Sequence, residues 1–185
     1  MPTYISLLRG INIGGRNIIK MEALRKAYLE LGFGDVKSYI QSGNLVFTSE
    51  SRDCVALAAA IHAKIADTFG LQVPNLVISA DDFKAILSAN KMANDETSEE
   101  KNHSELHIIF LAEAAATPEK MAAIALLKQE KEALAWQKNA IFIYCPDGYH
   151  KSKIHNNYIE NQLKTAATTR NWRTCQKISQ LIPAD

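Results

Sequence analysis

The sequence has few cysteines and none of the long apolar runs that mark specialised classes of protein. Its 185 residues include only three cysteines, Cys54, Cys145 and Cys175, and no two of them form a C-x-x-C pair. This spacing indicates neither a disulfide framework nor a zinc site, and it favours a reduced compartment. No apolar run approaches the roughly 20 residues that a membrane span needs, and the first residues lack a signal-peptide pattern. We therefore expect a cytoplasmic protein without a membrane partner.

An excess of charge of one sign is also missing, because the formal net charge is only +1. This balance excludes a general electrostatic attraction to nucleic acid or membranes. The charge is uneven along the chain, however. Residues 91–105 carry five acidic residues against two lysines, and residues 150–185 carry six basic residues against two acidic ones. The basic segment is a regional indication of an anionic partner.

Sequence motifs of known catalytic chemistry are missing as well. The chain has no G-x-S-x-G nucleophile motif, and no pair of carboxylates stands out for acid–base work. The stretch "GINIGG" (10–15) matches neither the dinucleotide-binding pattern G-x-G-x-x-G nor the P-loop pattern, because Lys20 comes too late. The sequence therefore assigns no catalytic residue and no cofactor.

The residues that are present predict an α+β fold in the first half of the chain. The predicted strands are 3–8, two strands within 35–49, and 75–80; the predicted helices end at Gly32 and Gly70. Ser51 or Asp53 is expected to cap the second helix, and Ser79 forms a capping-box pair with Asp82. The resulting order β-α-β-β-α-β is that of a ferredoxin-like, split βαβ sheet.

The second half repeats this pattern as β-α-β-β-α and adds a C-terminal helix. The predicted elements are a strand at 106–112, a helix beginning at Thr117-Pro118, a hairpin within 132–145, a helix after the turn at 146–148 and a last helix at about 171–182. We predict two related subdomains, 1–93 and 105–185, joined by an acidic linker at 94–104.

The stretch "LLRGINIGGRN" (7–17) has the composition of an anion-binding loop. Gly14 and Gly15 let backbone N–H groups approach a ligand closely. The cationic and amide donors are supplied by Arg9, Arg16, Lys20, Asn12 and Asn17. Arginine presents a planar fork that matches two oxygens of a phosphate or carboxylate. The alternative is a glycine-rich β–α connection whose arginines simply face solvent.

The stretch "TAATTRNWRT" (165–174) suggests a second anion-binding element. Thr168 and Thr169 are expected to cap a helix that begins near Asn171, which would place Arg170 and Asn171 at its positively polarised end. Helix N-termini attract anions.

The stretch "YHKSKIHNN" (149–157) crowds lysines, histidines and asparagines at the start of a helix, with Ser152 as the expected cap and Lys153 beside it. His150 and His155 are five residues apart, which departs from the four-residue spacing of a helical metal pair. We therefore predict no metal site here.

These stretches together resemble a bacterial family of uncharacterised proteins, the domain of unknown function 1697 (DUF1697). The segments that carry the resemblance are "YISLLRGINIGGRNIIKMEALR" (4–25), "YIQSGNLVF" (39–47), "PDGYHKSKI" (146–154) and "TTRNWRTCQKI" (168–178). The resemblance implies an α+β protein of two related subdomains. It implies no established activity.

Three hypotheses of function follow. The preferred one is a binding protein for a phosphate-bearing anion, either a small molecule such as a nucleotide or a nucleic-acid backbone, at one composite site. Its predicted residues are Arg9, Asn12, Gly14, Gly15, Arg16, Lys20, Ser42, Asn44, Ser152, Lys153, Arg170 and Asn171. The second is a structural or protein-interaction module, monomeric or homodimeric, in which these residues hold subdomains or partners together. The third is an enzyme acting on a phosphorylated metabolite. The sequence nominates no general base for it, and His150 and His155 are the only nearby candidates that titrate near neutral pH.

Overall fold

The protein is described here by a computed structural model that covers residues 1–94, 103–137 and 139–183. The chain divides into two compact units, of which unit 1 comprises Met1–Lys84 and Lys177–Asp185 and unit 2 comprises Ala85–Gln176. The predicted linker at 94–104 lies mostly outside the described residues, so the predicted subdomain boundaries stay a prediction.

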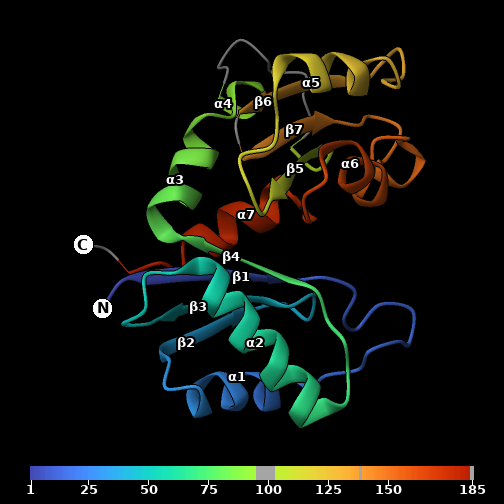
Figure 1. The fold of residues 1–185 in the computed structure, drawn as a ribbon. Coiled ribbons are helices and arrows are strands. Elements are labelled where there is room, and N and C mark those ends of the chain that lie inside the picture. Colours follow the sequence, from blue (N-terminus) through green and yellow to red (C-terminus); the bar gives the residue numbers. More distant parts are fainter. Residues whose placement is uncertain (95–102, 138, 184–185) are drawn as a thin grey trace. The chain divides into compact units, whose positions relative to one another are not determined.

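Unit 1 is built on a four-stranded antiparallel sheet in the order β2-β3-β1-β4 (Figure 1). Its strands are β1 (Thr3–Leu8), β2 (Gly34–Tyr39), β3 (Asn44–Thr48) and β4 (Asn75–Ser79). Its helices are α1 (Met21–Glu30), α2 (Cys54–Phe69) and the first part of α3 (Ala80–Ser88). This order confirms the predicted ferredoxin-like arrangement of the first half.

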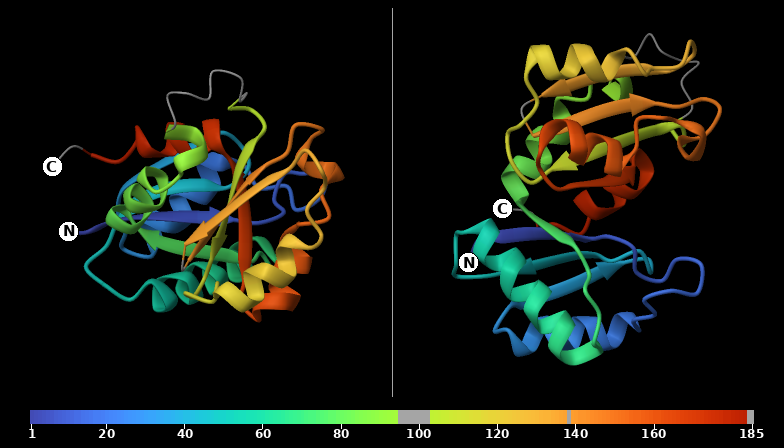
Figure 2. Two further views of the ribbon diagram at one scale, coloured as in Figure 1. Left: turned by 90° about the horizontal axis from the view of Figure 1, so that it is seen from above. Right: turned by 45° about the vertical axis from the view of Figure 1, so that its right-hand side comes forward.

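Helices α1 and α2 cover one face of this sheet, and the hydrophobic core lies between these helices and the sheet (Figure 2). Leu24 and Tyr28 of α1 and Ile61 of α2 pack with residues of the central strands, including Phe47. The Tyr28 hydroxyl is fully buried and donates a hydrogen bond to Ser6 Oγ over 2.8 Å. Burial raises the Tyr28 pKa well above its ordinary value, so this hydroxyl remains protonated and able to donate.

Unit 2 repeats the topology with the sheet order β6-β7-β5-β8. Its strands are β5 (Leu106–Leu111), β6 (Ala133–Gln137), β7 (Ala140–Tyr144) and β8 (Ala167–Asn171). Its helices are α4 (Lys91–Asn94), α5 (Pro118–Ala125), the 3-10 turn η1 (Tyr149–Lys151), α6 (Asn156–Leu163) and most of α7 (Trp172–Ser179). Met121 and Ile124 of α5 and Ile159 of α6 pack on Ile109 and Ile141 of the central strands.

The sequence misplaced two caps in unit 2. Thr168 and Thr169 do not cap a helix, because both belong to β8, which pairs antiparallel with β5. Ser152 does not cap α6 either. The cap is His155, whose Nδ1 accepts a hydrogen bond from the Tyr158 N–H over 3.4 Å. Both segments do lie close to a helix start. However, Thr168 and Thr169 are paired in β8, and Ser152 ends the 3-10 turn η1 instead of beginning α6.

Several other caps occupy the predicted positions. Asp53 Oδ1 accepts from the N–H groups of Val55 and Ala56, over 2.9 and 3.0 Å, at the start of α2. Ser79 and Asp82 form the expected pair at the start of α3. Asp53 Oδ1 and Ser79 Oγ thus accept from backbone N–H groups that have no partner within the helix, and Asp82 Oδ2 accepts from the Ser79 hydroxyl.

Replacing Asp53 by alanine is expected to lower the free energy of unfolding by about 1 kcal/mol, because the first turn of α2 loses its acceptor. Urea denaturation followed by circular dichroism measures this change. Asp67→Ala is the matched control, since Asp67 is exposed in the last turn of the same helix, where a carboxylate opposes the helix dipole. Equal destabilisation by both substitutions would contradict the assignment of Asp53 as the cap.

Candidate functional site

The glycine loop, residues 9–20, follows β1 and folds into a small hairpin. The Arg16 N–H donates to the Ile13 carbonyl over 3.0 Å, and the Asn12 N–H donates to the Asn17 carbonyl over 3.1 Å. Gly14 and Gly15, between them, have φ angles of 58° and 74°. Two consecutive positive φ angles are required by the type I′ turn that closes tight hairpins. The two glycines therefore serve the turn, whether or not they also contact a ligand.

Arg9 lies where β1 passes into this loop. It is half-buried, and its N–H donates to the Pro74 carbonyl over 2.8 Å, next to the start of β4. This bond continues the pairing of β1 with β4 by one residue. The backbone of Arg9 is therefore held at the end of the central strand β1, beside β4, rather than in the hairpin.

The side chain of Asn12 anchors this loop. Its Nδ2 donates to the Ile19 carbonyl over 3.0 Å and to the Gln41 carbonyl over 2.8 Å, and its Oδ1 accepts from the Ile19 N–H over 2.8 Å. Both amide hydrogens are thus used, because an asparagine side chain has two. Asn12 closes the loop on itself and attaches it to the turn between β2 and β3.

The turn between β2 and β3 completes this end of unit 1. Asn44 is buried, and its Nδ2 donates to the Tyr39 carbonyl over 3.1 Å and to Ser42 Oγ over 2.9 Å. Gly43 lies so close to β1 that a Cβ there would be 2.6 Å from Leu8 Cβ. The glycine loop and the Ser42–Asn44 turn, which lie far apart in the sequence, are therefore neighbours in unit 1.

The surface of this end carries cations and exposed isoleucines. Arg16 and Lys20 are exposed, and no described residue forms a salt bridge with either of them. Residues 1–21 and 36–49 contain no aspartate or glutamate. Ile13, Ile18 and Ile40 are also exposed. This arrangement is suited to contact a ligand that has both anionic and apolar parts.

The predicted residues of unit 2 fall into buried and exposed groups. Ser152 is buried, and its Oγ accepts from the Ile154 N–H over 3.1 Å, whereas Lys153 is exposed. Asn171 Nδ2 donates to the Ser104 carbonyl over 2.6 Å, and its Oδ1 accepts from the Arg173 N–H over 2.9 Å. Ser152 and Asn171 therefore have structural hydrogen bonds of their own.

Arg170 lies in β8 with much of its side chain buried. Its Nη1 donates to the Thr169 carbonyl over 2.9 Å and to Thr168 Oγ1 over 3.3 Å. Desolvation by burial lowers the Arg170 pKa to about 10, although the neighbouring Cys175 acts in the opposite direction. The guanidinium remains charged at neutral pH in an environment of low polarity, where its attraction for an anion is stronger than in water.

A polar cluster joins the two motif segments of unit 2. Thr169 Oγ1 donates to Asn156 Oδ1 over 2.7 Å and lies 2.9 Å from the Tyr149 hydroxyl. The imidazole of His107 stacks on the Tyr149 ring, with 4.8 Å between ring centroids. The segments 149–157 and 165–174 thus meet within unit 2. Convergence of the motif segments of both units on one ligand stays a prediction.

His107 is a titratable residue of this cluster that sequence reasoning missed. It is half-buried, and desolvation lowers its pKa below the ordinary value of 6.5. The signal that could have found it is a single polar residue in the otherwise apolar strand "LHIIFL". Of the histidines proposed as general bases, His155 has a structural role as the cap of α6 and His150 is exposed.

Among the described residues, no cluster of histidine, cysteine, aspartate and glutamate side chains could hold a metal ion. Burial raises the pKa values of Cys145 and Cys175 to about 12. Both thiols are therefore protonated at neutral pH, as expected for cysteines that act as small apolar side chains rather than nucleophiles. No described helix has the length and apolar character needed to cross a membrane.

The two sheets define the class of the protein as a duplicated α+β fold. A similar fold is found in the solved structure of the conserved bacterial protein SP0830 from Streptococcus pneumoniae, with a TM-score of 0.72 and 27% sequence identity. The match covers 97% of this chain and 98% of that chain.

The chain belongs to the family described as protein of unknown function (DUF1697), whose family model matches residues 1–142. That match includes the glycine loop and the Ser42–Asn44 turn, whereas the motifs at 146–154 and 168–178 lie beyond it. No curated protein matches the chain.

Replacing Asn12 by alanine is expected to destabilise the protein by about 2 kcal/mol, because three hydrogen bonds are removed. Asn17→Ala is the matched control, since Asn17 also has a positive φ but its side chain donates one bond, to the Gly10 carbonyl over 2.9 Å. Urea denaturation should show the larger decrease in stability for Asn12→Ala. Equal decreases would mean that backbone strain, not the Asn12 bonds, dominates.

The low pKa of His107 predicts a pH-dependent stability. As the pH falls through 6.5 toward the folded pKa, the unfolded chain binds more protons than the folded one, so the free energy of unfolding decreases. His107→Phe keeps a ring against Tyr149 and removes the titration. Urea denaturation between pH 7.5 and 5.0 should show a smaller decrease in stability for this variant. Parallel curves for variant and parent would contradict this account.

Proposed function

We propose that the protein binds an anionic, phosphate-bearing ligand at the glycine-loop end of unit 1. The observation that carries this proposal is the anchored loop itself. Asn12 holds the hairpin to the Gln41 carbonyl, and exposed Arg16 and Lys20 belong to a segment, residues 1–21, that contains no aspartate or glutamate. A loop fixed before binding loses less conformational entropy when it captures a ligand.

The chemistry of the exposed donors favours phosphate. Arginine and lysine both form charge-assisted hydrogen bonds with phosphate oxygens, and arginine does so with two parallel donors. Ligand classes that fit are a nucleotide or the backbone of a nucleic acid.

A second candidate function is a structural or protein-interaction module. It is favoured by the observation that Asn12, Asn44 and Ser152 use their side chains in hydrogen bonds within their own unit. In this candidate, the exposed isoleucines Ile13 and Ile18 contact a protein partner. The first candidate requires Arg16 and Lys20 to bind the anionic ligand, whereas the second does not.

We also propose a bacterial, cytoplasmic protein. The three cysteines are free thiols, as is usual in a reduced compartment. The similar structure is described as a conserved bacterial protein.

The double variant Arg16→Ala/Lys20→Ala is expected to weaken binding of a short single-stranded oligonucleotide or of tripolyphosphate by about tenfold. Fluorescence anisotropy measures the oligonucleotide and isothermal titration calorimetry measures tripolyphosphate. For the oligonucleotide, the plot of log affinity against log salt should also flatten by about 0.7 for each phosphate that the variant no longer neutralises.

The matched control is Lys26→Ala/Arg52→Ala, which removes the same charge from two other exposed positions of unit 1. Retained binding in the control and binding weakened by about tenfold or more in the loop variant would support the anion site. Equal weakening in both would show only a general charge effect. Unchanged binding in both would favour the structural candidate.

A further inference from the structure

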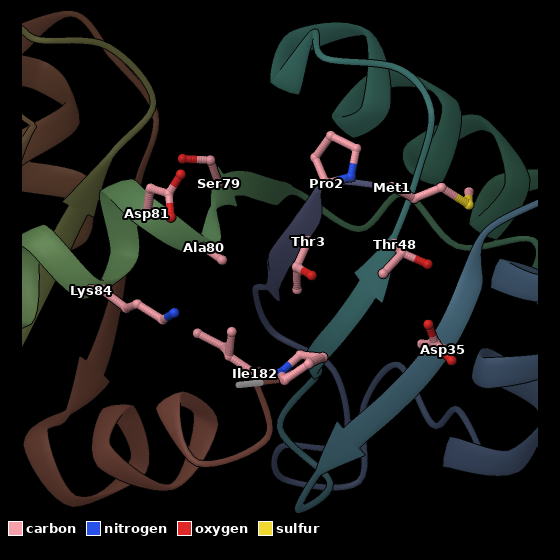
Figure 3. A pocket seen from close by; sticks show the side chains of 11 residues that line it. Met1, Pro2, Thr3, Asp35, Thr48, Ser79, Ala80, Asp81, Lys84 and Ile182 are labelled. Carbon is pink, nitrogen blue, oxygen red and sulfur yellow. The ribbon is translucent and has the colours of Figure 1, made fainter. Parts of the chain in front are cut away.

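Two features at opposite ends of strand β1 could receive a ligand in unit 1. The first is a cavity of about 400 Å³ beside Thr3, where β1 begins (Figure 3). Asp35 and Asp81 contribute two carboxylates to its lining. The Lys84 ammonium group and the α-ammonium group of Met1 balance them. Because these charges cancel, the cavity selects neither anions nor cations. The second feature is the glycine-loop end, where the charge is of one sign.

Three exposed isoleucines distinguish the glycine-loop end of unit 1. Ile13, Ile18 and Ile40 have exposed fractions of 63%, 64% and 51%. Leu29 and Val55, which are also exposed, lie instead on the helices α1 and α2. Exposed apolar side chains that gather in one place mark surfaces that bind a partner or ligand. The ligand of this end is therefore expected to have an apolar part.

The hydrogen bonds of Asn12 bring two of these isoleucines to the same part of the surface. Its side chain bonds with the backbone of Ile19, and Ile18 is the preceding residue. Its Nδ2 also donates to the Gln41 carbonyl, and Ile40 precedes Gln41. Consecutive Cα atoms are about 3.8 Å apart. Ile18 and Ile40 therefore each lie one residue away from a residue that Asn12 contacts.

The exposed cations of the glycine loop lie beside its isoleucines. Ile13 and Arg16 form a β-bridge across the turn of the loop, and side chains of directly opposite residues lie on the same side of a β-ladder. Lys20 comes two residues after Ile18 in the chain. The loop therefore presents an isoleucine close to each cationic group.

A nucleotide unit combines the two kinds of group that such a surface binds. Its phosphate accepts charge-assisted hydrogen bonds from arginine and lysine, and its base has two apolar faces. Inorganic phosphates and sugar phosphates lack an apolar face, so they would leave the isoleucines exposed to water. The bases of single-stranded nucleic acid are also accessible to side chains. A free nucleotide and a single strand therefore share the chemistry that fits.

We propose that the glycine-loop end of unit 1 recognises a nucleotide unit through both its phosphate and its base. Arg16 and Lys20 bind the phosphate. The base lies against Ile13, Ile18 and Ile40. This inference rests on the proposed anion site and specifies the ligand of that site. Because isoleucine side chains form no hydrogen bonds, the surface requires a base but does not distinguish one base from another.

Isothermal titration calorimetry of the full chain with ATP and with tripolyphosphate tests this inference. Both probes carry three linked phosphates, and only ATP carries a base. We expect ATP to bind about tenfold more tightly, although tripolyphosphate has no fewer negative charges. The double variant Ile13→Ser/Ile18→Ser should bind ATP about tenfold more weakly than the parent and tripolyphosphate equally well.

The matched control is Leu29→Ser/Val55→Ser, which removes two exposed apolar side chains from α1 and α2. It should bind both probes like the parent. All four substituted side chains are exposed, so both double variants are expected to fold, and circular dichroism checks this.

Two oligonucleotides distinguish the sources of the nucleotide unit. Fluorescence anisotropy compares a short single strand with a strand of the same length whose nucleotides are abasic, so that phosphates and sugars are matched. The strand with bases should bind more tightly than the abasic one, and Ile13→Ser/Ile18→Ser should remove this difference. Tighter binding of the strand than of ATP would indicate nucleic acid as the ligand, and the reverse order would indicate a free nucleotide.

The inference is overturned if ATP binds no more tightly than tripolyphosphate, if the isoleucine variant binds ATP like the parent, or if that variant loses both probes equally. Tripolyphosphate binding that depends on Arg16 and Lys20 would in these cases leave the anion site itself supported. Binding of neither probe would overturn the anion site and this inference together.

Discussion

The three hydrogen bonds of the Asn12 side chain are the constraint on which one end of unit 1 depends. They connect the two ends of the glycine loop through Ile19 and connect that loop to the β2–β3 turn through Gln41. Without them the loop would be a flexible connection of glycines and exposed side chains. With them, Arg16 and Lys20 belong to a loop held in one conformation. The site proposed for an anion therefore depends on a residue whose own side chain makes three structural hydrogen bonds.

The two units reach the same topology with different cores. Unit 1 packs aromatic rings, with Phe33 stacked on Phe47 at 4.5 Å and Tyr28 edge-on to Phe47 at 5.6 Å. In unit 2 the buried cluster around α5 and α6 contains no phenylalanine and includes Ile109, Ile141 and Ile159, whereas the buried Phe110 and Phe142 lie outside this cluster. A fold is compatible with many cores when volume and the pattern of apolar positions are kept. This explains why the duplication is clear in the order of elements although the halves share little residue identity.

Local features of the fold could be predicted from the sequence alone. Apolar alternation, helical spacing and helix capping involve residues that are close together in the sequence. For this reason strand β1, the cap Asp53 and the pair Ser79–Asp82 were found in the expected places. Features that depend on pairing between segments far apart in the sequence were decided only by the tertiary structure. The polar strand β8 forms because β5 supplies its hydrogen-bond partners. Such pairing is a long-range property, and no single stretch of sequence contains it.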